Sequence, residues 1–255
     1  MKSIIQIFTT ILLTAVICSS CTKNEIHYGE FEKVTPDQVM LKVNYNIAYA
    51  ANPPVQIKIN GARVSMLIQT RYPYPGGGYG TLGDSRPDYL VTKPGNQEVS
   101  ISIPKKGTNI DSVLLYKTSI AVEAGKAYTL HLTDTATTTS SLLALDDFTL
   151  PDSGAVRYKF VNLMPNVPSV DLYYGTTLMA SGIGYLKESD YFTMKIPTGT
   201  VLAWTVRAAG GTTALATYSS VSTVLNRRIY TIFSTGYTGR TDNVRKPYLA
   251  FFLTR

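Results

Sequence analysis

The sequence contains few of the side chains that bind metals or attack substrates. Of its 255 residues, two are cysteine, two are histidine and one is tryptophan. The cysteines, Cys18 and Cys21, stand close together near the N-terminus, and the histidines, His27 and His131, are far apart in the chain. A structural zinc site takes about four cysteine or histidine ligands, and a serine-histidine-aspartate centre needs its histidine beside an activated serine. The sequence therefore predicts no metal site, no cofactor and no catalytic residue.

A short apolar segment precedes the two cysteines. Residues 4–17 are mostly apolar and follow a basic start. A membrane-spanning helix needs roughly 20 apolar residues, so this segment is typical of the core of a secretory signal peptide. Two small serines then lead into Cys21, and the pattern resembles the bacterial lipobox, in which the signal peptide is cut before a cysteine that receives a lipid. We expect a signal peptide over 1–20 and a lipid containing palmitate on Cys21; the alternative is an ordinary signal peptide followed by a free thiol.

Lipidation would decide both the chemistry and the location of the mature chain. Cys18 would leave with the signal peptide, so the mature chain would hold neither a free thiol nor a disulfide. A linker over 21–37 would join the lipid to the folded part. We expect a protein that is held in the outer membrane by its N-terminal lipid, on either the periplasmic or the surface face.

Acidic residues are fewer than basic ones, and the formal net charge is +7. The basic residues are spread along the chain without an arginine-rich tract, so we expect no nucleic-acid partner. Anionic partners of an exported protein include lipopolysaccharide phosphates, acidic glycans and envelope proteins. The alternative is a solvated, slightly basic surface without a specific partner.

Amphipathic helices are missing beyond the N-terminal segment, and strand patterns fill the rest of the chain. Apolar and polar residues alternate in "VMLKVNYNI" (39–47), "VQIKING" (55–61), "EVSISIPKKG" (98–107) and "GAVRYKFVNL" (154–163). Turn residues interrupt this alternation about every ten residues, a spacing typical of antiparallel sandwiches. The sequence therefore predicts an all-β protein with Ig-like antiparallel β-sandwiches.

The two halves of the chain resemble each other in three segments that keep their order. "VNYNIAYAANPPVQIKING" (43–61) aligns with "VNLMPNVPSVDLYYG" (161–175), which places Gln56 opposite Asp171. "DYLVTKPGNQEVSISI" aligns with "DYFTMKIPTGTVLAWTV", and "KAYTLHLTDT" aligns with "RIYTIFSTGY". Ordered matches of this kind indicate an internal repeat. We predict two sandwich domains, over 38–150 and 152–255. The core of the second should include Val156, Phe160, Leu172, Trp204, Val206, Ile232 and Phe251.

The second half resembles a known family. "VPSVDLYYG", "DYFTMKIPTGT" and "RRIYTIFSTGYTG" are similar to the domain of unknown function 4397, and the first half resembles it more loosely. The resemblance implies Ig-like sandwiches in an exported bacterial protein, often in tandem copies. Together with the lipobox it implies a cell-envelope lipoprotein of Gram-negative, glycan-degrading bacteria. The family supplies no catalytic residues, which implies that the protein is not an enzyme.

The remaining polar residues are expected to be structural or solvated. His131 lies between two leucines and is predicted to be an exposed residue on the outer face of a strand. Asp146 and Asp147 are adjacent, so their side chains should point in opposite directions. Asp171 should lie on the outer face of its strand. Trp204 should share a core face with Leu202 and Val206; the alternative is a sugar-stacking platform.

A glycine- and tyrosine-rich insert over 71–89 is the strongest candidate for a binding site. It reads "RYPYPGGGYGTLGDSRPDY" and has no counterpart in the second half. The glycines lack the lysine and helix of a phosphate-binding loop. Aromatic rings on a long loop suit a sugar ring or a protein partner, whereas the alternative is a hairpin extension packed on its own domain. The candidate ligand-binding residues are Arg71, Tyr72, Tyr74, Tyr79 and Arg86.

Three functions remain open at this point. The first is a non-catalytic binding or scaffold module for a glycan or an envelope protein. The second is a purely structural subunit or anchor of a surface assembly. The third is a glycoside hydrolase, which would need two carboxylates facing each other across a cleft.

Overall fold

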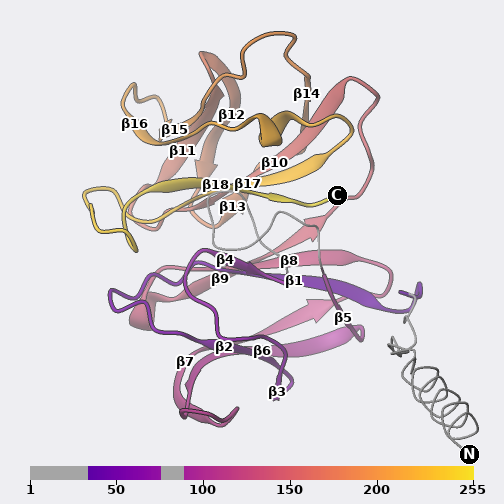
Figure 1. Ribbon diagram of the computed structural model, residues 1–255, viewed down its shortest axis with the longest axis vertical. Helices are drawn as coiled ribbons and strands as arrows, with labels where there is room; N and C mark the ends of the chain where they lie inside the picture. The colour runs from indigo at the N-terminus through magenta and orange to yellow at the C-terminus, as the bar shows by residue number, and fades with distance from the viewer. Residues whose placement is uncertain (1–33, 76–88) are drawn as a thin grey trace, which may run out of the picture. The chain divides into compact units, whose positions relative to one another are not determined.

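The regular secondary structure of the described residues is β-strand, as predicted, apart from two short 3₁₀ helices. The structure is a computed structural model that describes residues 34–75 and 89–255, and Thr35–Arg255 form one compact unit (Figure 1). The expected signal peptide, both cysteines, His27, Tyr79 and Arg86 lie outside the described residues. Among the described residues, no helix has the length and apolar character to cross a membrane.

The short 3₁₀ helix η1 (Ala136–Thr138) lies in the first half of the chain, whose strands form two sheets. We call them inner sheet 1 and outer sheet 1. Inner sheet 1 contains β1 (Val39–Tyr45), β4 (Tyr72–Tyr74), β5 (Leu90–Thr92), β8 (Ala127–Thr133) and β9 (Ser140–Asp146). Outer sheet 1 contains β2 (Gln56–Ile59), β3 (Ala62–Arg63), β6 (Gly95–Pro104) and β7 (Asp111–Val122).

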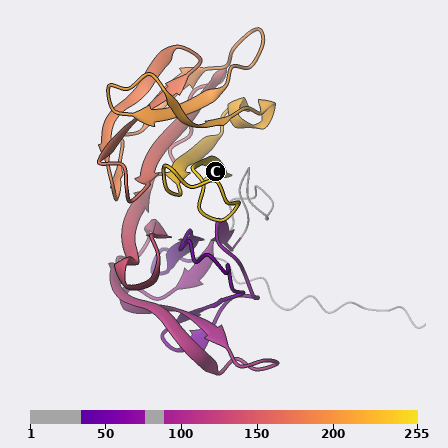
Figure 2. The ribbon, with the colours of Figure 1, turned by 90° about the vertical axis from the view of Figure 1, so that its left-hand side faces the viewer.

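The second half forms a further pair, inner sheet 2 and outer sheet 2, and the 3₁₀ helix η2 (Val221–Val224) (Figure 2). Inner sheet 2 contains β10 (Ala155–Leu163), β13 (Lys187–Glu188), β14 (Phe192–Lys195), β17 (Ile229–Thr235) and β18 (Tyr248–Leu253). Outer sheet 2 contains β11 (Ser169–Tyr174), β12 (Thr177–Gly184), β15 (Trp204–Ala208) and β16 (Ala214–Tyr218).

The two halves share one strand topology. The strand order is β4-β1-β8-β9 in inner sheet 1 and β13-β10-β17-β18 in inner sheet 2. The outer sheets likewise match as β3-β2-β6-β7 and β12-β11-β15-β16. Most pairs are antiparallel, as predicted, but β1–β8 and β10–β17 are parallel. Parallel neighbours need a long crossover, and in each half the strands of the outer sheet lie within that crossover.

Strand registers correct the sequence alignment of the halves by one residue at the first strand. Val43 pairs with Leu130, and its equivalent Phe160 pairs with Ile232. The alignment had placed Val43 opposite Val161, which lies on the other face of its strand. A slip of one residue exchanges the two faces of a strand. The predicted equivalence of Gln56 and Asp171 is consistent with the topology, since the two residues lie on the matching strands β2 and β11.

Each half has its own apolar core between its two sheets. In the second half, the predicted core residues are all fully buried: Val156, Phe160, Leu172, Trp204, Val206, Ile232 and Phe251. Burying a large apolar side chain contributes about 1.5–3 kcal/mol. Leu202 was wrongly placed with Trp204, because β15 begins only at Trp204 and Leu202 is 47% exposed.

The outward faces of the two inner sheets cover each other. Val161, Leu163, Phe233, Ala250 and Phe252 form a third buried cluster on inner sheet 2, and Leu142 of β9 packs against it. The hydroxyl of Thr133 on β8 donates to the carbonyl of Leu163, at 2.7 Å. The central strands β8 and β17 of the inner sheets are therefore buried on both faces, although polar residues occupy many of their outward positions.

Candidate functional site

The one histidine in the described part of the chain is buried between the inner sheets. His131 on β8 is 0% exposed, and its Nδ1 lies 3.0 Å from Asn44 Nδ2. Burial, reinforced by the charges of Lys159 and Lys42, lowers the pKa of His131 to about 3. The prediction of an exposed histidine is wrong because Phe233 and Phe252 of the second half cover this face. A neutral, enclosed imidazole has no access to a substrate.

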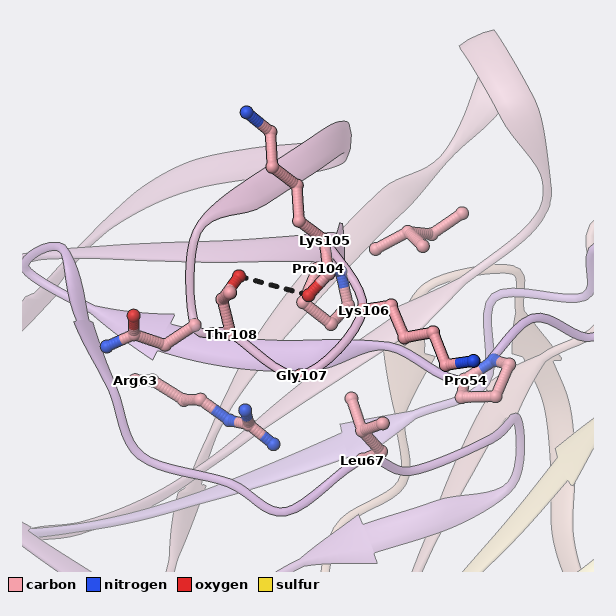
Figure 3. Close-up of a pocket in the computed structure, with 10 residues that line it drawn as sticks. Pro54, Arg63, Leu67, Pro104, Lys105, Lys106, Gly107 and Thr108 are labelled. Carbon is pink, nitrogen blue, oxygen red and sulfur yellow. Dashed lines mark hydrogen bonds between the residues drawn. The ribbon is translucent and has the colours of Figure 1, made fainter.

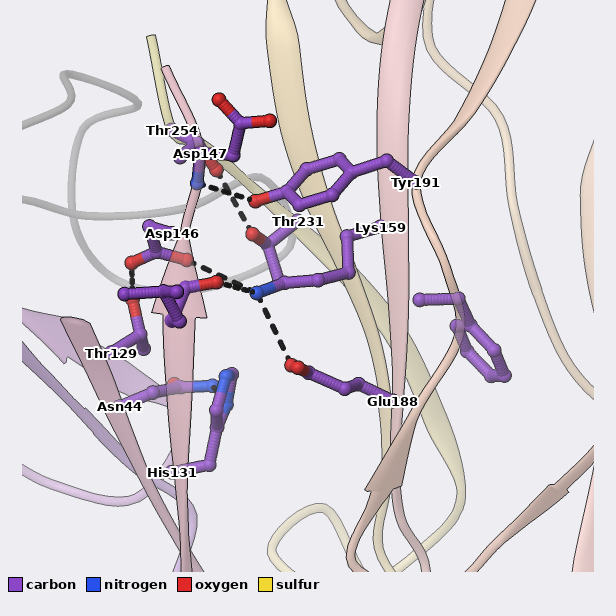
Figure 4. Close-up of polar contacts among 12 residues, drawn as sticks. Asn44, Thr129, His131, Asp146, Asp147, Lys159, Glu188, Tyr191, Thr231 and Thr254 are labelled. Carbon is purple, nitrogen blue, oxygen red and sulfur yellow. Dashed lines mark hydrogen bonds and ion pairs between the residues drawn. The ribbon is translucent and has the colours of Figure 1, made fainter. Parts of the chain in front are cut away.

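A lysine and two carboxylates form an ion-pair network beside this histidine (Figure 4). Lys159 Nζ lies 3.3 Å from Asp146 Oδ1 and 3.1 Å from Glu188 Oε2, and it donates to the carbonyl of Leu145 at 2.8 Å. Burial opposes the charge on Lys159, but Asp146, Tyr191 and Glu188 outweigh it and raise the pKa of the ammonium. The network joins β9 of the first half to β10 of the second.

The neighbouring carboxylate has a separate structural partner. Asp147 accepts from the Arg157 guanidinium at 2.7 Å, and its backbone N–H donates to the Tyr191 hydroxyl at 3.0 Å. The hydrogen bonds from Arg157 and Thr149 hold the pKa of Asp147 far below its usual range. Asp146 and Asp147 thus have different partners, in agreement with the prediction that adjacent strand residues point apart.

Asp171 is on the outer face of β11, as predicted, but it is buried rather than solvated. Its carboxylate accepts from Ser181, from Gly182 N at 2.7 Å and from Gly210 N at 2.9 Å. Burial raises the pKa of Asp171, but the bonds from the Gly210 and Gly182 amides outweigh burial, and the net shift is downward. The side chain therefore holds two turns in place.

The sole tryptophan belongs to the core. Trp204 is fully buried and its Nε1 donates to Thr223 Oγ1 at 3.2 Å. Its ring centroid lies 4.9 Å from that of Tyr158 and 4.8 Å from that of Tyr174. The core interpretation is confirmed, and the sugar-stacking alternative is wrong.

The insert begins and ends on the same edge of inner sheet 1. β4 pairs with β1 at Tyr45 and β5 pairs with β1 at Leu41. The equivalent strands of the second half, β13 and β14, are joined by residues 189–191 alone, whereas residues 75–89 join β4 to β5. The extra length of the first half lies at this connection.

Two of the five candidate ligand-binding residues make structural contacts at the start of the insert. The Arg71 guanidinium donates to the carbonyls of Asn243, at 2.7 Å, and of Lys246, at 3.1 Å, and it lies 3.4 Å from the centre of the Tyr248 ring. Burial lowers the pKa of Arg71 to about 10, so it stays charged at neutral pH. The Tyr74 hydroxyl donates to the Val64 carbonyl. We therefore assign Arg71 and Tyr74 to structural support.

The other candidates lie beyond the side chains that the structure describes. Tyr72 belongs to β4, and its backbone pairs with Tyr45. Tyr79 and Arg86 are in residues 76–88, outside the described ranges. They remain predictions from the sequence.

A basic hollow on outer sheet 1 was not predicted from the sequence. The hollow has a volume of about 600 Å³ and is lined by Arg63 of β3, by Leu67 and by the turn that joins β6 to β7 (Figure 3). Lys106 extends from this turn towards Pro54 (Figure 3). Lys105 extends from the side of the turn that faces away from Arg63 and Leu67. The adjacent lysines of "PKKG" were its one signal in the sequence.

The described residues contain no cluster of three metal-ligating side chains. Two further carboxylates also serve structural roles: Asp111 pairs with Lys58 at 2.8 Å, and Asp134 accepts from the Tyr237 hydroxyl at 2.5 Å. The arrangement is suited to holding the sheets and turns in place, and the hollow is suited to binding an anion.

Comparison with known proteins identifies one family. The family model described as a domain of unknown function, DUF4397, matches residues 43–173, just over half of the chain. The match covers most of the first half and ends in β11, so most of the second half, which was expected to be the better match, lies outside it. None of the curated proteins compared with the chain matches it.

Among solved structures, the chain is similar to a leucine-rich repeat protein from Bacteroides thetaiotaomicron. The two are 16% identical, with a TM-score of 0.19. The similarity covers 82% of this chain and 26% of that one, so the chain spans about a quarter of the length of that protein.

Proposed function

Because the chain belongs to the DUF4397 family, whose description as a domain of unknown function assigns it no activity, we propose that it is a non-catalytic lipoprotein. In this proposal, Cys21 carries the lipid and the protein lies in the outer membrane. Its sandwiches act as a binding or scaffold module for a glycan or an envelope protein. The common topology of the halves supports two tandem copies of the family domain.

One observation carries the non-catalytic part of the proposal: the candidate catalytic side chains are engaged in structural contacts. His131 is enclosed between the inner sheets. Asp146 and Glu188 both bind Lys159, and Asp171 accepts bonds from the amides of two turns. A glycosidase instead needs a pair of carboxylates free to face the sugar across a cleft.

The insert remains the proposed contact region for an envelope partner or glycan, now through Tyr79 and Arg86. The test is retention of the full-length protein, purified in detergent, on a glycan array and in pull-downs of envelope proteins. We expect Tyr79→Ala with Arg86→Ala to lose the retention. The matched control is Tyr173→Ala with Arg207→Ala, a tyrosine–arginine pair of outer sheet 2 with the guanidinium 4.3 Å from the ring centre. Equal retention of both variants would contradict a role for the insert.

The second candidate function is a structural subunit of a surface assembly, and β7 favours it. This strand is at the edge of outer sheet 1 and runs from Asp111 to Val122, whereas the equivalent β16 covers only Ala214–Tyr218. Within the described chain β7 pairs with β6 alone, and a long open edge can accept another strand. Cross-linking of cysteines introduced along β7 in intact cells would detect such an assembly.

A further inference from the structure

The basic hollow is formed by a turn whose conformation is fixed by backbone hydrogen bonds and by the Gln56 side chain. The Lys105 amide donates to the Ile110 carbonyl at 2.8 Å, and the Thr108 amide donates to the Lys105 carbonyl at 3.0 Å. Gln56 Nε2 donates to the Asn109 carbonyl at 3.1 Å and to Asp111 Oδ1 at 2.7 Å. Because these bonds fix the turn, a ligand that binds there has little backbone ordering to oppose it.

The cations of this turn are specific to the first half. Ser102 pairs with Gln56, and the equivalent Arg207 pairs with Asp171. Lys105 and Lys106 lie three and four residues after Ser102, and the residues at the same distances after Arg207 are Gly210 and Gly211. Asp171 holds the second turn as Gln56 holds the first. The fold therefore needs an anchored turn at this position, but it does not need two lysines there.

The lysines are available to a ligand. Both are exposed, and among the described residues neither forms an ion pair. Arg63, across the hollow, uses its Nε to donate to the Ser65 carbonyl at 2.8 Å, and within the described ranges its two terminal nitrogens form no hydrogen bond or ion pair. Lys106 and Arg63 thus supply two cationic groups at one concave surface, and Lys105 adds a third positive charge on the same turn. Positive charge concentrated in this way favours an anionic ligand.

The rest of the lining indicates what kind of molecule carries the anion. Pro54, Leu67 and Pro104 supply small apolar surfaces, and Thr108 and Asn109 supply polar groups. A sugar ring presents both C–H faces and hydroxyl groups, and the volume lies within the range of small-molecule sites. We propose that this hollow binds a saccharide bearing carboxylate, sulfate or phosphate groups. The inference rests on the proposed binding function and gives it a ligand class and a second location, separate from the insert.

The test measures binding of full-length protein in detergent to three soluble probes: a uronate oligosaccharide, a sulfated oligosaccharide and a phosphorylated sugar. Poly-glutamate and vesicles of anionic phospholipid are measured in parallel. The variant is Lys105→Glu with Lys106→Glu. The control is Lys93→Glu with Lys195→Glu, which makes the same change of net charge at exposed lysines outside the hollow.

We expect at least one saccharide probe to bind the natural protein and the control, and the Lys105/Lys106 variant to bind at least about tenfold more weakly. Equal binding by the variant would overturn the inference while leaving the proposed binding function intact. Binding of poly-glutamate or vesicles in place of the saccharides would also overturn it. If no probe binds but the insert-dependent retention persists, the inference fails and the proposed function stands.

Discussion

Lys159 on β10 places its ammonium 3.3 Å from the Asp146 carboxylate on β9, in a contact that joins the two halves of the chain. The Lys159 side chain is 2% exposed and the Asp146 side chain 0%. Glu188 and the Leu145 carbonyl complete the environment of the ammonium. A charge pair in such a position depends on both members, since each one offsets the desolvation of the other.

Removing the lysine should therefore destabilise the protein strongly. We expect Lys159→Ala to lower the free energy of unfolding by about 3–5 kcal/mol, because the Asp146 carboxylate stays buried without its cation. Urea titration followed by circular dichroism measures this loss. The double change Lys159→Met with Asp146→Leu should recover part of it, because no buried charge remains.

An exposed ion pair supplies the control for this experiment. Lys126 and Glu123 lie 2.6 Å apart, and their side chains are 42% and 70% exposed. Removing Lys126 should leave the free energy of unfolding nearly unchanged, because solvent screens an exposed ion pair. A loss for Lys159→Ala as small as that for Lys126→Ala would show that the contact between the halves is open to solvent.

The strand pattern was predictable from sequence because each core is formed by residues that alternate along the strands. Val156, Trp204 and Phe251 were predicted to be core residues and are fully buried. The same alternation correctly placed Lys42, Asn44 and His131 on the opposite face, but it suggested solvent there. A polar residue at an outward position has the same pattern whether water or another sheet covers it.

One signal for the second buried face was present in the sequence. Phe233 on β17 and Phe252 on β18 occupy outward positions with apolar side chains, and both are fully buried. Strands buried on both faces carry near-continuous apolar runs, and "YLAFFL" is such a run. The partner sheet could not be identified from this run, because contacts between segments so far apart leave no local pattern.

An isolated second half should fold but associate. Residues 152–255 contain a complete core of their own, but separation would expose the outward cluster that includes Val161, Leu163, Phe233 and Phe252. We expect this fragment to be rich in β structure and to form concentration-dependent oligomers, because exposed apolar patches of this kind drive association. Sedimentation velocity over a range of concentrations measures it.

The matched variant of the fragment carries Phe233→Ser with Phe252→Thr. It should keep the β spectrum and sediment as a monomer, since both side chains point away from the fragment's core. A natural fragment that is monomeric at all concentrations would contradict a closed contact between the inner sheets in solution.

The proposed lipid anchor makes a prediction that is independent of the fold. Changing Cys21 to Ala should release the protein from the membrane fraction and abolish labelling with palmitate, because the proposed acceptor thiol is gone. Cys18→Ala should leave both unchanged. Persistent palmitate labelling of the Cys21→Ala protein would contradict lipidation at Cys21.

The buried histidine should make the free energy of unfolding depend on pH in a range where the carboxylates with lowered pKa contribute little. The pKa of His131 falls from 6.5 to about 3 on folding. Below pH 6.5 the unfolded chain therefore binds a proton that the folded chain does not, and stability falls as pH falls, until about pH 3. The carboxylates with lowered pKa, such as Asp111 and Asp171, reduce stability only near and below the ordinary aspartate pKa of 3.8. Between pH 6.5 and 5, the contribution of His131 is about 2 kcal/mol.

The variant His131→Gln isolates this contribution. Glutamine keeps an amide oxygen that can accept from Asn44 Nδ2, which lies 3.0 Å from the natural imidazole, and it does not titrate. We expect the natural protein to lose about 2 kcal/mol more than the variant between pH 6.5 and 5, measured by urea unfolding at each pH. Any titration of His27 is common to both proteins and cancels in the difference. Parallel pH profiles for the two proteins would mean that His131 takes up its proton in the folded state, and that the contact between the inner sheets admits water.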